Sequence, residues 1–536
     1  MAIFRLTRTK QNTKAFARAA LVALALSQAP LQAQNPTAST PRPSVASGGL
    51  PTLGDTADLS AAAERRLGDR IVVSIYRDPD FIDDPVLGDY LQTIWQPLMT
   101  AARARGELSS ELDERFAWEL FLIRDRSINA FALPGGYLGV HLGLISTVSS
   151  RDELAAVMGH ELSHVTQRHI SRLISQQERT TPLMIGAMIL GALAASKNPQ
   201  AASAVMAGGQ AVAAQGQLNF SRDMEREADR VGLNVMLDAG FDGRGAAGMF
   251  DKLQQASRLN DNGAFPYLRS HPLSVQRVAE AQARLQLASL DAPTLTAASQ
   301  QAANNARALH AMMAARAKVL ADPGVDVLRA MQTDALRPAP QTSQSVGVLY
   351  GGALASAKLR DFAATQSLAE KTIAASQGNA DAQSAAALLQ IEIDLLAGRA
   401  PPSFQTIDIS KTTRRADLLI KSQALLAAGK PQDVASRLST WVNDQPKDSA
   451  AWQLLATAYG DQGQTVRAIR ADAESRAARL DYPAAVDRLK AAQNMIRSNS
   501  GMPNNADFIE SSIIDTRTRQ LESLVRQQAL QDKLDR

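Results

Sequence analysis

Cysteine is absent from this 536-residue sequence. Its absence excludes disulfide bonds, catalysis by a thiolate, zinc held by cysteine, and lipid attachment through a cysteine. Aromatic residues are also scarce, at 4% of the chain, whereas alanine is abundant. This composition favours helices over β-sandwiches. A chain of this length is expected to form two or three domains.

Acidic residues are missing from residues 1–33, which hold five lysines and arginines and a short apolar run at 19–26. A basic start, a brief apolar stretch and Ala33 before a polar segment are typical of a secretory signal peptide. The run is far shorter than the roughly 20 residues that cross a bilayer, which argues against a membrane anchor. Removing the five cations changes the formal charge from +4 to −1, so net charge does not support nucleic-acid binding. We therefore expect an exported protein, with the periplasm as its simplest destination.

The sequence up to about residue 290 predicts a compact mixture of helices and strands. A helix is expected over 57–69, and Trp118–Ile123 is predicted as a strand. Residues 128–141 predict a β-hairpin that turns at Pro134-Gly135-Gly136. Ser150, with a glutamate three residues later, is a capping box that predicts a helix to about Ser175.

Residues 183–214 contain the most apolar segment of the sequence. Its first part, Leu183–Ala195, has thirteen residues, too few for an ordinary membrane span. We expect a buried hairpin here, with a hairpin that contacts membrane or substrate as the alternative.

A 34-residue repeat occurs near the C-terminus. Bulky residues at 418 and 425, Gly429 and small Val434 recur as Trp452, Tyr459, Gly463 and Ala468. This period and residue order are typical of the tetratricopeptide repeat. Degenerate units are expected upstream, at 350–376 and 380–398, and a further helix over 483–496.

His160-Glu161-Leu162-Ser163-His164 is the motif that points to chemistry. Two histidines four residues apart project from one face of a helix, where both can bind one zinc ion. Glu161 is rotated about 100° from His160, so it can act as a general base toward a water molecule without being a ligand. The pattern predicts a zinc-dependent hydrolase with one zinc per chain.

A catalytic zinc site needs a third protein ligand. Residues 221–229 predict another helix, in which Glu225 and Asp229 share a face. We interpret Glu225 as the ligand and Asp229 as the acid that orients a ligand histidine. Spacing alone does not choose between Glu225 and Glu227, which we expect to be solvated.

The motif His160-Glu161-x-x-His164, the following Glu225-x-x-Ala228-Asp229 and the upstream segment 129–136 together resemble the HtpX and CAAX-prenyl-endopeptidase family of metallopeptidases. With the signal peptide and the repeats, the chain looks closest to a periplasmic member of that family. The resemblance implies a gluzincin fold, Glu225 as third zinc ligand and Asp229 as its supporting acid. It also implies a role in the quality control and assembly of outer-membrane proteins.

In this fold class the substrate lies extended along an edge strand, and the segment Asn129, Ala130 and Phe131 is predicted to provide that edge. His271, in a His-Pro segment that the family also has, has two interpretations. It stabilises the oxyanion of the transition state, or it occupies the open zinc position and holds the enzyme latent. Arg277 is expected either to assist at the site or to lie on the surface, and His169 to have a structural role. His310 is expected to be solvated.

The sequence thus predicts a mainly α (α+β) protein in which a gluzincin domain with a small sheet precedes an α-helical tetratricopeptide solenoid. The predicted function is hydrolysis of misfolded or stalled envelope proteins, with the outer-membrane assembly machinery as the expected partner of the solenoid. The alternative is a chaperone or scaffold that acts through the solenoid, with a latent zinc site. The expected segments are a signal peptide at 1–33, a flexible linker at 34–55, the metalloprotease domain at 56–290, a helical linker at 291–340, the repeat domain at 341–500 and a helical tail at 501–536.

Overall fold

The computed structural model describes most of the chain after residue 58. The described ranges are 59–176, 221–258, 267–290, 296–338, 342–498 and 505–534. All of them belong to one compact unit, Thr56–Arg536. The predicted signal peptide, linker and apolar hairpin lie outside these residues. Of the helices within the described ranges, none is both long and apolar enough to cross a membrane.

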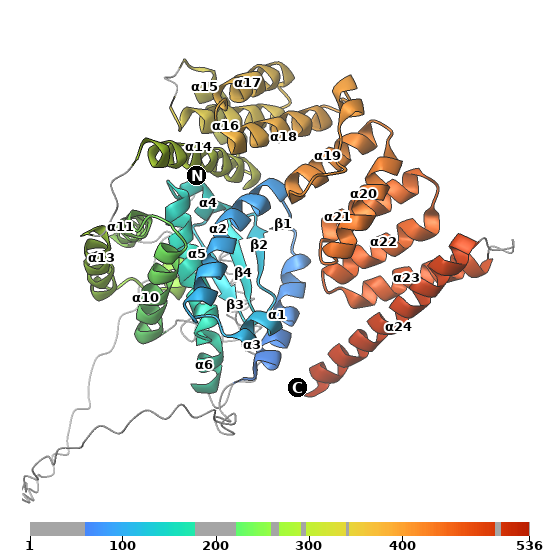
Figure 1. Cartoon of the computed structure of the whole chain (residues 1–536), viewed down its shortest axis with the longest axis horizontal. Coiled ribbons are helices and arrows are strands. Elements are labelled where there is room, and N and C mark those ends of the chain that lie inside the picture. Colours follow the sequence, from blue (N-terminus) through green and yellow to red (C-terminus); the bar gives the residue numbers. More distant parts are fainter. Residues whose placement is uncertain are drawn as a thin grey trace, which may run out of the picture. The chain divides into compact units, whose positions relative to one another are not determined.

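Helices surround a small sheet in the first half of the chain (Figure 1). The elements are α1 (Ala61–Tyr76), β1 (Phe81–Ile82), α2 (Pro85–Ala104), α3 (Ser110–Arg115), β2 (Glu119–Ile123), β3 (Ala130–Leu133), β4 (Tyr137–His141), α4 (Leu142–Thr147), α5 (Arg151–Thr166), α6 (His169–Gln176), α10 (Arg222–Asp238), α11 (Arg244–Arg258), α12 (Tyr267–Ser270) and α13 (Val275–Leu290).

The four strands have the order β1-β2-β4-β3, with β2 parallel to β4 and the outer strands antiparallel to their neighbours. The predicted strand and hairpin are confirmed. Gly135 and Gly136 make the turn at φ values of 78° and 84°, where a side chain would be strained. Alternate residues face opposite layers: Phe121 packs against α1 and α6, whereas Leu122 packs against α2 and α5.

The first helix begins and ends later than the predicted range 57–69. Ser60 caps α1 by accepting a hydrogen bond from the N–H of Ala63, and the helix continues past Asp69 to Tyr76. The reason is that apolar residues keep helical spacing beyond Asp69: Ile71 and Ile75 are buried under the sheet.

The helix that starts at Ser150 is also shorter than predicted. The Ser150 hydroxyl accepts from the N–H of Glu153, as a capping box requires. However, the helix ends at Thr166, and Arg168 adopts a left-handed φ of 54° before α6 begins. The Arg168 guanidinium binds the buried carboxylate of Glu64 at 3.1 Å, a contact that supports this uncommon backbone conformation.

The second half of the chain is helical. Its elements are α14 (Ala297–Leu320), α15 (Val325–Leu336), α16 (Ser345–Lys358), α17 (Phe362–Ala375), α18 (Ala380–Leu396), the 3₁₀ helix η1 (Pro402–Thr406), α19 (Arg415–Ala427), α20 (Pro431–Asp444), α21 (Ser449–Asp461), α22 (Thr465–Ala478), α23 (Tyr482–Ser498) and α24 (Asn505–Leu534). We call α16–α24 the C-terminal helical array. The pair α19–α20 and the pair α21–α22 begin 34 residues apart. Gly429 and Gly463 follow the first helix of each pair with φ values of 75° and 72°, which an L side chain rarely adopts.

Helix α14 packs on the first half of the chain, so the expectation that His310 is solvated is wrong. His310 is 2% exposed. Its ring nitrogens hydrogen-bond to the Tyr90 hydroxyl at 2.6 Å and to the carbonyl of Val148 at 2.8 Å. An alanine-rich sequence conceals this burial because alanine is compatible with both packed and solvated helix faces.

Arginine side chains make several of the polar contacts that join the C-terminal helical array to the first half. Arg316 of α14 is buried and binds Asp84 and Glu392, each with distances down to 2.6 Å. Arg415 binds Asp83 at 2.8 Å and is one-quarter exposed. The third pair, Arg77 with Asp481 at 3.0 Å, has 61% of the arginine side chain exposed.

We expect replacement of Arg316 by Met to destabilise the protein by about 3–5 kcal/mol, because two largely buried carboxylates lose their counter-charge. Urea unfolding followed by circular dichroism measures this loss. Arg337→Met is the matched control, since Arg337 is 70% exposed and, among the described residues, pairs with Asp334 three residues earlier. Equal stability of the two variants would contradict the structural role assigned to Arg316.

Candidate metal centre and active site

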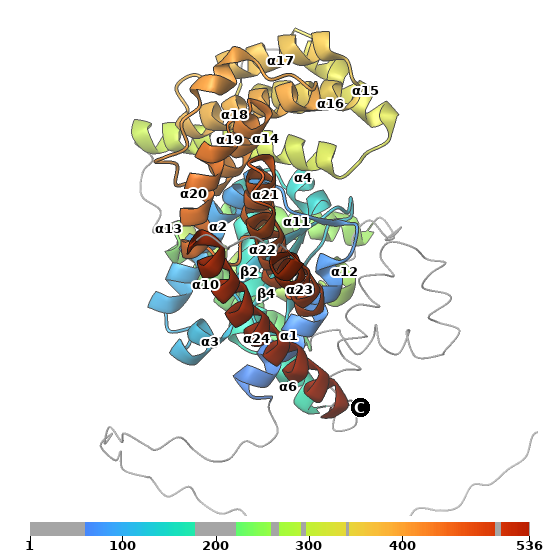
Figure 2. The ribbon, with the colours of Figure 1, turned by 90° about the vertical axis from the view of Figure 1, so that its right-hand side faces the viewer.

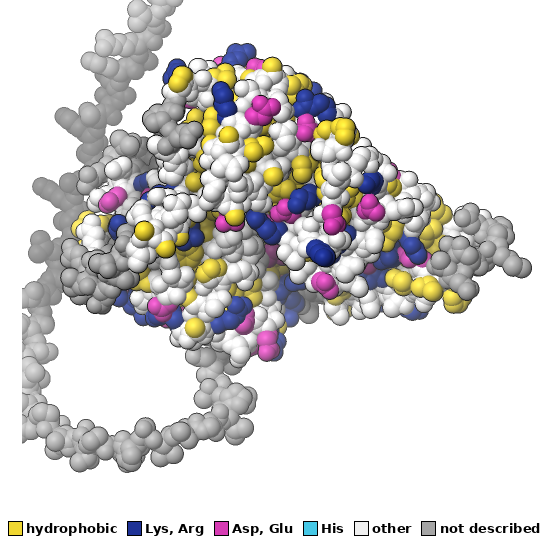
Figure 3. Space-filling model, turned by 45° about the horizontal axis from the view of Figure 1, so that its top comes forward, with side chains coloured by type: hydrophobic (Ala, Val, Ile, Leu, Met, Phe, Trp, Pro, Cys, Tyr) yellow, Lys and Arg dark blue, Asp and Glu magenta, His cyan; other side chains and the backbone are white. Residues whose placement is uncertain are grey.

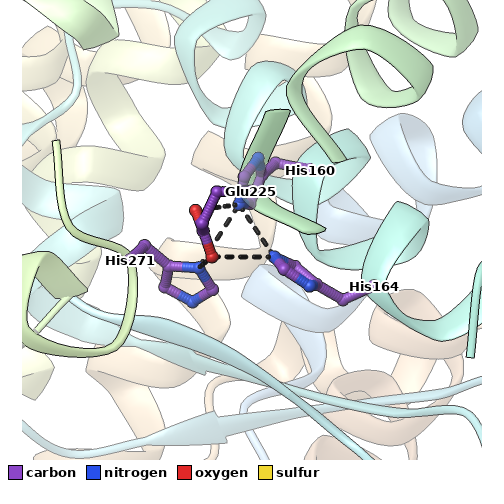
Figure 4. A group of neighbouring side chains, drawn as sticks. All are labelled: His160, His164, Glu225 and His271. Carbon is purple, nitrogen blue, oxygen red and sulfur yellow. Dashed lines mark hydrogen bonds and ion pairs between the residues drawn. The ribbon is translucent and has the colours of Figure 1, made fainter. Parts of the chain in front are cut away.

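Four buried side chains from three segments of the chain meet at one point (Figure 4). His160 and His164 come from α5, Glu225 from α10 and His271 from the segment after α12. One donor atom from each lies within 4.8 Å of the other three. All four side chains are almost fully buried. The structure thus brings together His160, His164 and Glu225, the three residues expected to be ligands, and places His271 beside them.

The spacing of the donor atoms suits a small tetrahedral cation. The Nε2 atoms of His160 and His164 are 3.0 Å apart. Nδ1 of His271 lies 3.3 Å from His160 Nε2 and 3.0 Å from Glu225 Oε1. Zinc bonds of 2.0–2.1 Å place tetrahedral ligands roughly 3.3 Å from one another. Three imidazole nitrogens and one carboxylate oxygen therefore fit zinc in both chemistry and spacing.

Asp229 fixes the orientation of His160. Its carboxylate lies 3.0 Å from His160 Nδ1, which directs Nε2 toward the other donors. Arg277 holds Asp229 with two hydrogen bonds of 2.6 and 2.8 Å, so it is not a surface residue. Burial lowers the pKa of His160, but the hydrogen bonds that its ring donates to Asp229 and Glu225 outweigh this effect and raise the pKa to about 10.

His169 contacts Nδ1 of His164, just as Asp229 contacts Nδ1 of His160. The two Nδ1 atoms are 2.8 Å apart, and His169 Nε2 lies 3.1 Å from Glu227. Arg172 binds the same Glu227 oxygen at 2.8 Å, so the expectation that Glu227 is solvated is wrong. Burial lowers the pKa of His169 to about 4, which keeps this ring neutral. The break at Arg168 allows the contact, because a continuous helix would turn His169 away from His164.

Glu161 is fully buried and faces β3. Its Oε2 accepts a hydrogen bond of 3.0 Å from the backbone N–H of Ala132. Its Oε1 makes no hydrogen bond to the described residues and lies 3.4 Å from His271 Nε2. Burial raises the pKa of Glu161 above its ordinary value. A carboxylate with a raised pKa and one unused oxygen is suited to accept a proton beside the metal ligands.

Within the described ranges, strand β3 is the edge of the sheet on this side. The N–H of His141 bonds to the carbonyl of Asn129, and hydrogen bonding alternates along an antiparallel pair. Asn129, Phe131 and Leu133 therefore direct their backbone groups toward β4. Ala130 and Ala132 direct theirs outward, consistent with the bond from Ala132 to Glu161. That substrate binds along the edge Asn129–Phe131 stays a prediction. Within this segment, the register shows that the backbone N–H and C=O of Ala130 point outward.

Two glycines that sequence reasoning missed allow α5 and α10 to cross closely. A side chain at Gly232 would lie 2.9 Å from the backbone of Gly159 and His160. Glu225, Asp229 and Gly232 are spaced i, i+4 and i+7 on one face of α10. The close crossing therefore places both acids against the histidines of α5. A glycine in each helix interior, where glycine is costly, was the signal in the sequence.

Tyr267 is a further residue that the sequence analysis missed. Its buried ring stacks on His271, with centroids 4.5 Å apart and planes 26° apart. The carbonyl of Tyr267 also accepts a 2.9 Å hydrogen bond from the N–H of His271. These contacts hold the His271 ring where its Nδ1 faces the other donors.

Comparison with known proteins agrees with this geometry. Residues 89–285 match the model of peptidase family M48. The chain is 28% identical to the beta-barrel assembly-enhancing protease of Escherichia coli (strain K12), over 84% of this chain and 88% of that protein. The protein of the same name from Yersinia pestis is 27% identical over 89% and 92% of the two chains. Mitochondrial metalloendopeptidase OMA1 of Arabidopsis thaliana is 31% identical over 31% of each chain.

The chain combines a group of metal ligands beside a buried glutamate with a match to a family of metallopeptidases. It is a metalloendopeptidase. Its residues 89–285 match peptidase family M48, and its likeness to the beta-barrel assembly-enhancing proteases extends over most of its length. The predicted family and the mainly helical fold class with a small sheet are thereby confirmed.

We expect Gly232→Ala to lower stability by about 1–3 kcal/mol, because the added methyl group forces α5 and α10 apart. The same movement separates Glu225 from His160 and His164, so metal content after dialysis should fall as well. Gly88→Ala is the control: Gly88 is helical and has open space around it, so the change should be neutral or stabilising by about 0.5–1 kcal/mol. Full metal retention in Gly232→Ala would count against the role of the crossing.

Proposed function

We propose that this chain is a zinc-dependent endopeptidase of the cell envelope that degrades misfolded or stalled proteins and supports the assembly of outer-membrane proteins. The observation that most directly supports hydrolysis is the position of Glu161. This carboxylate lies beside the ligand group and is tied to the edge strand on which a peptide would lie.

His160, His164 and Glu225 would hold the zinc ion, with Asp229 and His169 orienting the two imidazoles. Bound zinc polarises a peptide carbonyl and makes a water molecule more acidic. Glu161 supplies the base: it accepts a proton on the oxygen that Ala132 does not use and delivers it to the leaving amine. The hydrogen bond from Ala132 keeps this carboxylate at the edge of β3.

An extended substrate would add to β3 through the outward backbone groups of Ala130. This pairing reads the backbone rather than side chains, so it suits unfolded chains of many sequences. Burial of Glu161 and His164 limits access to the ligand group, which favours a thin, extended segment over a folded protein.

His271 raises a second candidate, a protein whose zinc site is latent and whose C-terminal helical array acts as a chaperone or scaffold. Nδ1 of His271 lies close enough to the donor atoms of Glu225 and His160 to bind the same ion, and Tyr267 stacks on the His271 ring. A fourth protein ligand leaves no open position for substrate. If His271 is this fourth ligand, it must move away from the metal before hydrolysis. If it is not a ligand, it can instead donate a hydrogen bond to the oxyanion.

Location and partners belong to the same proposal. The relatives named beta-barrel assembly-enhancing protease cover nearly all of this chain. Together with the signal-peptide pattern, this likeness supports a periplasmic protein that contacts the outer-membrane assembly machinery. The 34-residue spacing of the helix pairs α19–α20 and α21–α22 supports tetratricopeptide repeats as the partner-binding part. Membrane contact through 183–214 stays an open alternative.

The Glu161→Gln variant separates the two candidates. We expect it to bind about one zinc per chain, because Glu161 is not a ligand, and to hydrolyse casein about 10²–10⁴ times more slowly, because the base is lost. Zinc is measured by mass spectrometry and hydrolysis by release of labelled fragments. Full rescue of an envelope-assembly defect by this variant would favour the scaffold, and absence of zinc from both proteins would refute the metal site.

His271→Ala tests latency. If His271 blocks the open position, the variant should keep its zinc and hydrolyse casein faster than the parent. A fall in hydrolysis with unchanged zinc would instead assign His271 to the oxyanion. Zinc content must be measured in the same samples, because loss of metal would lower activity for a different reason.

A further inference from the structure

Helix α24 is the last element of the C-terminal helical array within the described ranges. Its inner face packs against α22 and α23 through Ile514 and Leu521, which are fully buried. Figure 2 shows α24 in front of these two helices, and no other described helix covers its opposite side. One face of α24 therefore lies against the array, whereas the other faces away from it.

The residues on the side away from the array recur every three or four positions, as one face of a helix requires. We call them the outer face of α24, and all are exposed except Ser523, which is half-buried. They are Ile509, Ser512, Ile513, Thr516, Arg519, Gln520, Ser523, Arg526, Gln527, Leu530 and Lys533. The outer face thus carries three cations and no acidic residue.

The acidic side chains of α24 are engaged by the neighbouring helices instead. Their partners on α22 and α23 are Arg470 for Glu510, Lys490 for Glu522 at 2.8 Å, and Gln493 for Asp515 at 2.7 Å. The sequence of α24 therefore places its acids toward the array, where they find partners, and leaves its outer face basic.

The three cations of the outer face form a row. Arg519, Arg526 and Lys533 are seven residues apart, so they follow one another along the same side of the helix. None of them forms an ion pair with the part of the chain that the structure describes. A partner that lies along α24 therefore gains from acidic groups opposite this row.

Apolar side chains are exposed at the start of the same helix. Phe508 is 73% exposed, Ile509 61% and Ile513 42%. Figure 3 shows hydrophobic side chains gathered at this end of the molecule, whereas basic and acidic side chains are interspersed elsewhere on the drawn face. The last helix of a solenoid usually has a polar outer surface. Apolar residues in that position indicate an interaction site.

The spacing of the outer face favours a helix as its occupant. Residues 509, 513, 516, 520, 523, 527 and 530 alternate steps of four and three, like the seam of a coiled coil. Each earlier helix from α20 to α23 packs against the next one, so a helix on the outer face continues that packing. A lipid surface fits less well, because Thr516, Gln520 and Gln527 in the middle of the seam would have to leave water.

Charge argues against an occupant from this protein itself. The outer face of a second copy presents the same cations, which would repel the first. The longer segments outside the described ranges also have more cations than acids: six against two in 1–58, and two against one in 177–220. A row of acidic residues must therefore come from another protein.

We propose that the outer face of α24 binds an amphipathic helix of a partner protein. Its apolar residues meet Phe508, Ile509 and Ile513, and its acidic residues meet the row of cations. This inference deepens the partner-binding role that the proposed function gives to the C-terminal helical array, and rests on that part of it alone. Hydrolysis at the metal centre is not required.

Peptide binding to the full chain that carries Glu161→Gln tests this proposal, since the probe is then not cleaved. The probe is a fluorescein-labelled peptide of four heptads, with isoleucine at a, leucine at d and glutamate at e and g. Repulsion between its glutamates keeps it from pairing with itself. Fluorescence anisotropy should show saturable binding, and the same peptide with lysine at e and g should bind about tenfold more weakly or less.

A charge exchange locates the binding site. The double change Arg519→Glu with Arg526→Glu should weaken the glutamate peptide about tenfold or more and should strengthen the lysine peptide. Damage to the fold would weaken both, so only a direct contact reverses the preference. Arg329→Glu with Lys371→Glu is the matched control: both residues are exposed, on α15 and α17, and their change should leave both affinities unaltered.

Three results would overturn the proposal: no binding of the glutamate peptide, equal affinity for the two peptides, or a preference that the charge exchange leaves as it was. Binding to phosphatidylglycerol vesicles in place of the peptide, lost in the same double variant, would assign the outer face to a membrane instead. Casein hydrolysis by the parent chain is measured separately, so failure here and failure of the proposed peptidase activity are distinguishable.

Discussion

Burial of charged groups in one small volume is the constraint on which the catalytic half depends. Any one of Glu161, Glu225, Asp229 or Arg277 would be costly to bury alone, since each would lose its hydration. Together they neutralise one another: Arg277 binds both Asp229 and Glu225, and the histidines lie between the acids. Burial raises the pKa of Glu225, but His271 and His160 more than reverse this effect and hold the pKa far below its ordinary range. Loss of one member therefore affects the whole group rather than one contact.

Much of this arrangement could be predicted from local patterns. The spacing of His160 and His164, the Pro-Gly-Gly turn and the Ser150 cap depend on residues close in sequence, where periodicity and turn chemistry are informative. The pairing of Glu225 and Asp229 with the histidines also followed from helical spacing together with the family resemblance. Fold class and family were correct for the same reason.

The errors concern contacts between distant segments. Neither glycine nor proline marks the helix break at Arg168, which depends on Glu64 about a hundred residues earlier. His310 lies in an alanine-rich stretch whose burial is decided by the helices against which α14 packs. The engagement of Glu227 depends on that same break, because only then can His169 reach it. Such effects arise from tertiary structure and leave little trace in a local pattern.

The contacts between the two halves of the chain differ in their exposure to solvent, and this difference has a mechanical consequence. The Arg316 cluster is buried and largely shielded from dissolved ions, whereas Arg77 and Asp481 form their pair in water. Screening by salt weakens exposed pairs much more than buried ones. At higher ionic strength the array should therefore stay hinged at α14 while its contact near α22 loosens. The width of the space between sheet and helices would then vary with the ionic strength of the compartment in which the protein works.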